Sequence, residues 1–183
     1  MASLDGHLLV ASQNLLDPNF AKSVILLVQH SDDGALGVVV NRPIGKTVQE
    51  LWREVGGGPC NNTQPVYLGG PVPGPLMAVH NQKSLADVQI VPGLFFSASK
   101  QNLDALVMRS DPTMKIFVGH SGWGAGQLDQ ELDQGSWLTT PTTPEFVFFD
   151  SIEVWQTVSR LIGRSMLQSM LHIKDMPDDP TVN

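Results

Sequence analysis

The chain has 183 residues, of which 42% are hydrophobic, and a formal net charge of −7. This length and apolar content suit one substantial core, so we expect residues 1–183 to form a single domain. The negative charge, without any cluster of lysine and arginine, argues against direct binding to nucleic acid, because such binding depends on cationic contacts with phosphates.

The chain contains one cysteine, Cys60. A single cysteine excludes an intrachain disulfide and is typical of a reducing compartment. Residues 1–5 lack the basic start and apolar segment of a signal peptide, and no apolar run approaches the ~18 residues of a membrane span. We therefore expect a cytoplasmic protein that does not contact a membrane.

The N-terminal part predicts strands. Residues 8–11 are apolar, and Asp17-Pro18 then predicts a short turn. Residues 24–28 are five consecutive apolar residues, the pattern of a strand covered on both faces. The turn residues 31–34 and the apolar run 36–40 complete a predicted hairpin. We expect this hairpin to be central in its sheet.

The strongest helix signal follows Pro43, which we expect to end the hairpin pairing. Thr47 and Glu50 match a capping box. The apolar residues that follow share one helix face: Val48, Leu51, Trp52 and Val55. The sequence Gly56-Gly57-Gly58-Pro59 ends this predicted helix, because glycine and proline both disfavour helix interiors.

The middle of the chain predicts short strands and one helix. Residues 66–68 and 76–79 are strand candidates joined by a proline-rich connection. Residues 88–91 and 94–96 flank a Pro-Gly turn and predict a hairpin. Ser99 then precedes apolar residues at helical spacing, so we expect it to cap a helix.

A glycine-rich stretch dominates the C-terminal half. Residues 115–118 predict a buried strand, residues 119–126 a loop with four glycines in eight residues, and residues 127–134 a short helix. Glycine reaches positive φ and lets other groups approach closely. We interpret these glycines as serving tight packing, with Trp123 buried near Trp137.

The last part of the chain predicts two strands and a helix. Residues 137–138 and 146–149 are apolar and flank a loop rich in threonine and proline. Asp150 and Glu153 resemble a second capping box. Apolar residues at a spacing of three to four then predict a helix that runs to about Ile173.

The glycine-rich stretch invites two chemical interpretations. Gly119-His120-Ser121 resembles the start of a nucleophile elbow, but Trp123 replaces the final glycine of G-x-S-x-G and would crowd the turn. The stretch also resembles a phosphate-binding loop, yet its glycine spacing fits no dinucleotide or P-loop motif and no lysine follows. We predict no catalytic residue and no cofactor.

Three histidines, His30, His80 and His120, lie at or just past predicted strand ends. Imidazoles with nearby aspartates can ligate a metal, but the spacing matches no metal motif. We predict no metal site and structural hydrogen bonds for all three. Arg42 is the best candidate for an anion contact, because a guanidinium binds carboxylate or phosphate bidentately. A surface ion pair is the simpler alternative.

Four ordered blocks carry a family resemblance. They are Asp17-Pro18-Asn19-Phe20 with Ser23-Val24; His30 with Gly34-Ala35, Gly37 and Asn41-Arg42-Pro43; Val66 to Val72 with His80; and Gly122 to Leu128 with Glu131 and Trp137-Leu138. Together they resemble the YqgE/AlgH family of bacterial proteins over residues 7 to about 163, followed by a C-terminal helix and tail over 164–183. The resemblance implies an α+β fold in which a largely antiparallel, barrel-like β-sheet is surrounded by helices. It implies no reaction.

We therefore expect a non-enzymatic cytoplasmic binding or regulatory module with a cleft formed by loops at strand ends. The expected lining residues are Asn41, Arg42, Gly69, Gly70, His80, Trp123, Gly124 and Gln127. The partner would be an unidentified protein or small molecule. Two alternatives stay open: a transcriptional regulator that acts through a protein partner, and an unrecognised hydrolase with Ser121 as its nucleophile.

Overall fold

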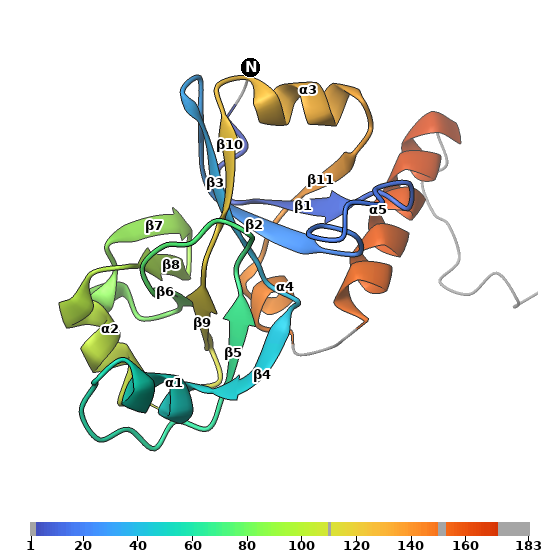
Figure 1. The fold of residues 1–183 in the computed structure, drawn as a ribbon. Coiled ribbons are helices and arrows are strands. Elements are labelled where there is room, and N and C mark those ends of the chain that lie inside the picture. Colours follow the sequence, from blue (N-terminus) through green and yellow to red (C-terminus); the bar gives the residue numbers. More distant parts are fainter. Residues whose placement is uncertain (1–2, 110, 150–152, 172–183) are drawn as a thin grey trace, which may run out of the picture.

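The structure, a computed structural model, describes residues 3–109, 111–149 and 153–171. Its strands form a five-stranded sheet in the order β10-β3-β2-β1-β11 and a six-stranded sheet in the order β4-β5-β9-β6-β8-β7 (Figure 1). Every named pairing is antiparallel except that of β5 with β9. The expected α+β class with a largely antiparallel arrangement is confirmed. The expected barrel-like sheet is wrong, because the described strands form two open sheets.

The five-stranded sheet is built around β2. Its strands are β1 (His7–Ala11), β2 (Val24–Ser31), β3 (Gly34–Val39), β10 (Ser121–Gly124) and β11 (Trp137–Pro141). β2 pairs with β1 on one side and β3 on the other, with a bulge between Leu27 and Gln29. The predicted hairpin is confirmed, and Leu26 at its centre is fully buried.

The six-stranded sheet contains one strand that the sequence did not predict. Its strands are β4 (Pro43–Thr47), β5 (Pro65–Leu68), β6 (Met77–His80), β7 (Val88–Val91), β8 (Leu94–Ser97) and β9 (Met114–Val118). As expected, Pro43 lies beyond the end of β3, which is at Val39. It also begins β4, where it lies opposite Tyr67. A proline fits here because β4 is an edge strand, where a missing ladder N–H is tolerated.

Helices cover the two sheets. They are α1 (Val48–Glu54), the 3-10 helix η1 (Lys83–Leu85), α2 (Lys100–Val107), α3 (Gln127–Asp133), α4 (Pro144–Phe148) and α5 (Val154–Leu171). The capping box of Thr47 and Glu50 at α1 is confirmed. Ser99 precedes α2 but makes no side-chain capping bond. Its hydroxyl instead donates to Asp87 Oδ1 at 2.8 Å.

Two local predictions were wrong. Residues 146–149 were expected to form a strand, but residues Pro144–Phe148 form α4. Short apolar runs are ambiguous between strand and helix, and here Pro144 in the first turn favours a helix. Residues Ser121–Gly124 were expected to be loop but form β10. The proposed cap at Asp150 and the expected helix end at Ile173 lie outside the described residues.

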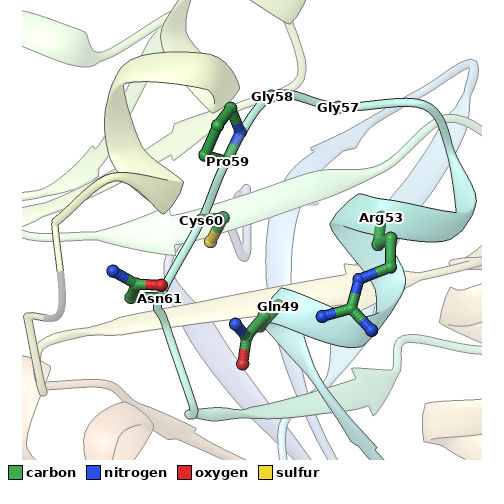
Figure 2. A pocket seen from close by; sticks show the side chains of 7 residues that line it. All are labelled: Gln49, Arg53, Gly57, Gly58, Pro59, Cys60 and Asn61. Atoms are coloured by element: carbon green, nitrogen blue, oxygen red, sulfur yellow. The ribbon is translucent and has the colours of Figure 1, made fainter.

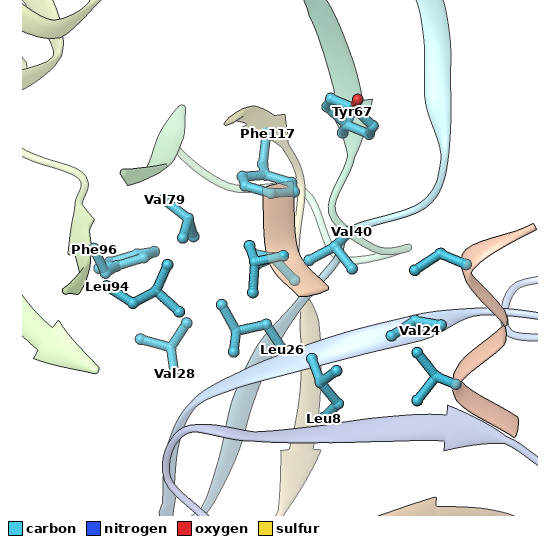
Figure 3. Close-up of a cluster of buried hydrophobic side chains, with 14 of the residues drawn as sticks. Leu8, Val24, Leu26, Val28, Val40, Tyr67, Val79, Leu94, Phe96 and Phe117 are labelled. Atoms are coloured by element: carbon cyan, nitrogen blue, oxygen red, sulfur yellow. The ribbon is translucent and has the colours of Figure 1, made fainter. Parts of the chain in front are cut away.

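The largest buried cluster draws side chains from both sheets and from α5. It includes Leu8 and Leu26 of the five-stranded sheet and Val79, Leu94 and Phe117 of the six-stranded sheet (Figure 3). Val10 of the five-stranded sheet and Val158 and Ile162 of α5 belong to the same cluster. A second cluster lies between α1, α2 and the six-stranded sheet, and a third surrounds Trp123 and Trp137. Leu26 belongs to the first cluster and Ile25 to the third. β2 is therefore covered on both faces, as its apolar run predicted.

Candidate functional site

The glycines expected to line a cleft lie where the chain passes between the two sheets. The Gly69 carbonyl accepts the Val39 N–H at 2.8 Å and the Ser121 hydroxyl at 3.1 Å. A Cβ on Gly69 would lie 2.2 Å from the Gly119 carbonyl oxygen, and one on Gly70 2.3 Å from the His120 carbonyl. These glycines therefore permit backbone to pack on backbone, which leaves no room there for a ligand.

Asn41 lies beside this crossing and fastens a turn to β2. Its side-chain carbonyl accepts the Val24 N–H at 2.9 Å. Its amide donates to the Lys22 carbonyl, also at 2.9 Å. Lys22 has a φ of 57°, a conformation that is uncommon for a residue with a side chain. Asn41 thus holds a strained turn in place.

Arg42 is bonded to the same turn. Its guanidinium donates to the Asn19 carbonyl and, at 3.0 Å, to the Ala21 carbonyl. Burial lowers the pKa of Arg42 below its ordinary value, and the Asp17 carboxylate partly opposes this effect. The Arg42 N–H groups that were expected to bind an anion therefore already donate to two backbone carbonyls.

His80 is fully buried and fully bonded. Its Nδ1 accepts the Gln82 N–H at 3.1 Å, and its Nε2 lies 2.9 Å from Ser97 Oγ, which donates to the Leu85 carbonyl at 2.5 Å. Burial lowers the pKa of His80 to about 4, although Asp87 acts in the opposite direction. The imidazole is therefore neutral at pH 7 and donates through Nε2.

The structure does not bring His80 together with the glycine crossing. β6 is antiparallel to β9, with His80 opposite Met114 at the start of β9. Leu68, which precedes Gly69, lies opposite Val118 at the end of β9. His80 is thus a full strand length from the other residues of the expected cleft.

Trp123 is 6% exposed and packs in an aromatic cluster, as expected. Its ring lies edge-on to Trp137 at a centroid distance of 6.1 Å and stacks with Phe20 at 6.2 Å. Both indole N–H groups donate to Glu131 Oε2, at 3.0 Å from Trp123 and 2.8 Å from Trp137. One carboxylate on α3 therefore satisfies two buried donors.

Gln127 closes the turn between β10 and α3. It donates to Glu131 Oε1 at 2.9 Å and accepts the Gly124 N–H at 3.1 Å. Gly126 has a φ of 68°, so the expected costly backbone conformation is present there. Gly122 and Gly124 face outward, and a Cβ on Gly124 would meet nothing closer than Gln127 Oε1 at 4.0 Å. A Cβ on Gly122 would come no closer than 3.8 Å to another atom and one on Gly126 would meet none within 4 Å, so the tight-packing interpretation is wrong for Gly122, Gly124 and Gly126.

Ser121 is buried and donates its hydroxyl to the Gly69 carbonyl. A nucleophile elbow needs an exposed Oγ next to a base. The side chain of His120 instead lies beside Gly74, whose Cβ would fall 2.9 Å from His120 Nδ1. The arrangement is that of a structural serine.

The third of the histidines at predicted strand ends is His30, and its Nε2 lies 3.7 Å from Asp129 Oδ1. Within the described ranges, no group of three or more His, Cys, Asp or Glu side chains could hold a metal ion. None of the helices in the same ranges is both long and apolar enough to span a bilayer.

A pocket of about 420 Å³ lies beside α1, away from the expected cleft (Figure 2). Gln49 and Arg53 are one helical turn apart on α1 and line it together. The loop after α1 supplies the opposite wall: Gly57, Gly58, Pro59, Cys60 and Asn61. The Cys60 thiol is buried and donates to the Val107 carbonyl at 3.4 Å, so it belongs to the wall rather than to the opening.

Three polar side chains line this α1 pocket without a hydrogen bond to another described residue. Within the described part of the chain, the side chains of Gln49, Arg53 and Asn61 form no hydrogen bond and no ion pair. Of the neighbouring carboxylates, Glu54 accepts from Lys46 at 2.6 Å, and Glu50 accepts from Thr47 while attracting Arg53 without a direct contact. The α1 pocket is therefore lined by a guanidinium without a hydrogen bond or ion-pair contact in the described residues and by two amides.

A second pocket, of about 270 Å³, adjoins the first, because Gly57 lines both. Its other lining residues are Trp52, Val55, Gly56, Pro75, Leu76, Ala98, Lys100, Leu103 and Asp104. In the sequence, Gly56-Gly57-Gly58-Pro59 predicted only the end of a helix. The signal that could have identified the site is an arginine in the last turn of a capped helix, directly before a loop of three glycines.

Comparison with known proteins identifies the family. The AlgH-like family matches residues 8–167. A UPF0301 protein of Chlorobaculum tepidum is 35% identical over 185 residues, with 97% of this chain and 95% of the relative covered. Another, of Stenotrophomonas maltophilia, is 38% identical over 170 residues, with 88% and 90% covered.

A solved structure agrees with these matches. The solution structure of the AlgH protein from Pseudomonas aeruginosa superimposes with a TM-score of 0.74 at 31% identity and covers 96% of both chains. The names of these relatives state no reaction or ligand. The fold, the four sequence blocks and these matches agree, and the chain belongs to the AlgH-like family.

Proposed function

We propose that this protein is a non-enzymatic cytoplasmic binding module and that the α1 pocket holds a small anion. One observation carries the proposal: the Arg53 guanidinium lines a pocket of about 420 Å³ and has no hydrogen-bond or ion-pair partner among the described residues. An arginine fork matches the geometry of carboxylate or phosphate oxygens. The cytoplasmic location is supported by Cys60, a free and buried thiol.

The other groups around the α1 pocket suit the same ligand. Gln49 and Asn61 each carry an amide NH₂ that can donate to an anion. Gly58 has no side chain, and a Cβ there would meet no atom within 4 Å. The backbone can therefore approach a ligand closely. A single guanidinium neutralises one negative charge, which favours a monoanion over a dianion.

Binding is favoured over turnover because the groups that suggested chemistry are engaged elsewhere. The Ser121 hydroxyl is bonded to Gly69, and His80 is bonded to Ser97 and Gln82 in the interior. The sequence-based cleft around Asn41 and Arg42 stays a prediction. Its polar side chains already bond the adjacent turn, and the α1 pocket is therefore the stronger candidate.

Titration with acetate and with inorganic phosphate, followed by NMR, tests the proposal. Arg53→Gln should weaken the binding of either anion about tenfold or more, because the charge-assisted hydrogen bonds are lost. Arg160→Gln is the matched control, since Arg160 is exposed on α5. Equal affinities for wild type and Arg53→Gln would overturn the α1 pocket as the anion site.

A second candidate is regulation through a protein partner. α5 exposes three large apolar side chains, Leu161, Met166 and Leu167, and the first two line a groove against β11. Exposed apolar patches of this kind often mark interaction sites. Replacing all three with serine should remove a partner that co-purifies with the wild-type chain. A partner retained by the triple variant would contradict this candidate.

A further inference from the structure

The second pocket differs in chemistry from the α1 pocket that it adjoins. Most of its lining is apolar: Trp52, Val55, Pro75, Leu76, Ala98 and Leu103. Its two charged residues neutralise each other, because Lys100 Nζ lies 2.8 Å from Asp104 Oδ2. One half of the combined site thus offers the Arg53 guanidinium, which has no hydrogen bond or ion-pair contact among the described residues, and the other half offers an apolar surface.

We infer that the ligand is an amphipathic monocarboxylate, with its carboxylate on Arg53 and its aliphatic tail in the second pocket. The inference rests on the proposed function, because it names the ligand class of the same site. The α1 pocket, of about 420 Å³, lies within the ~300–1,000 Å³ of ordinary small-molecule sites, and the second pocket adds about 270 Å³ to it. A ligand of this class would use both halves.

Gly57 is the point at which such a ligand would cross from one pocket to the other. It lines both pockets, and its N–H donates to the Trp52 carbonyl at 2.8 Å. A Cβ on Gly57 would lie 2.3 Å from Trp52 Cδ1 and Nε1. The absence of a side chain therefore keeps the indole in the apolar wall.

Val55 provides an independent reason to expect an apolar occupant. It ends α1, lines the second pocket and is 54% exposed. An exposed valine next to a half-open apolar pocket gains free energy when an aliphatic chain covers it. A purely polar ligand of the α1 pocket would leave Val55 in water.

The test is a series of saturated monocarboxylates from acetate to octanoate, titrated against the full chain by NMR. The indole N–H signal of Trp52 reports on the apolar pocket, because the ring lines it. We expect affinity to rise about fourfold for each methylene that enters the apolar pocket. Shifts should include Trp52 only for the longer chains.

Two variants separate the halves of the site. Val55→Asn should lower the ratio of octanoate to acetate affinity by about threefold or more, because it makes the wall of the apolar pocket polar without changing its charge. Arg53→Gln should weaken every acid in the series. Arg160→Gln should behave as wild type throughout. Val55 is exposed, so Val55→Asn is not expected to impair folding.

The outcomes distinguish the two proposals. If acetate and octanoate bind equally and both depend on Arg53, the inferred ligand class is overturned while the anion site stands. If affinity rises with chain length but does not depend on Arg53, both the ligand class and the anion site are overturned. If no acid in the series shifts any signal of the wild-type protein, the inferred ligand class is overturned, and phosphate binding alone then decides the anion site.

Discussion

Two glycine-rich regions of this protein use glycine in opposite ways. At the crossing between the sheets, Gly69 and Gly119 pack backbone against backbone, and the nearby polar side chains are bonded within the protein. At the end of α1, a Cβ on Gly58 would meet no atom within 4 Å, and Arg53 next to the loop forms no hydrogen bond or ion pair with the described residues. A glycine-rich sequence alone therefore does not show whether a region packs or binds. What distinguishes the two regions is whether the nearby polar side chains already have hydrogen-bond partners within the protein.

The largest expected loss of stability comes from a substitution at the backbone contact between Gly69 and Gly119. Gly69→Ala places a Cβ 2.2 Å from a backbone oxygen that cannot move freely, so we expect a loss of about 3 kcal/mol or more in unfolding free energy. Gly58→Ala is the matched control and should change it by less than about 0.5 kcal/mol. Denaturant unfolding of both variants measures the difference. Equal losses would remove the distinction between the two regions.

The pH dependence of stability gives the next test, because acid protonates His80, whose imidazole is hydrogen-bonded in the interior. His80 has a pKa of about 4 in the folded state and an ordinary value of 6.5 when unfolded. The unfolded chain therefore binds the proton more readily, and stability should fall as the pH drops from about 6.5 towards 4. Thermal melts across this range should show a shallower slope for His80→Asn than for wild type. Identical slopes would mean that His80 titrates normally in the folded state.

A pair of arginine variants compares the regions directly. Arg42→Gln removes donors to the Asn19 and Ala21 carbonyls, so we expect a loss of about 1–2 kcal/mol in unfolding free energy. Arg53→Gln removes no such bond and should change stability by less than about 0.5 kcal/mol. Chemical denaturation measures both values. A large loss for Arg53→Gln would show that this arginine has a structural partner in solution.

The smallest effects come from the turn before α3. Gly126 has a φ of 68°, so Gly126→Ala should cost about 1 kcal/mol of unfolding free energy. Gly124 faces open space on the edge strand β10, so Gly124→Ala should be nearly neutral. Thermal melts of the two variants test whether positive φ, rather than close packing, explains the glycines here. A larger loss for Gly124→Ala would contradict this account.

Local patterns in the sequence predicted much of the fold. The apolar run of β2 indicated burial on both faces, and Thr47 with Glu50 indicated the start of α1. Both signals depend on residues close together in the chain, as periodicity and capping do. The expected burial of Trp123 was also confirmed, although β10 was mistaken for loop because two of its four residues are glycine.

Other features depended on contacts between distant segments. The parallel pairing of β5 with β9 has no local signal in the sequence, and at α4 the apolar run suggested a strand although Pro144 favours a helix start. The same holds for the candidate site. Arg42 lies just before β4 and Arg53 lies in the last turn of α1, and the sequence around each does not show which of them has hydrogen-bond partners. Only the tertiary structure supplies the turn that occupies Arg42 and leaves Arg53 facing a pocket, because hydrogen-bond partners are set by spatial proximity rather than by position along the chain.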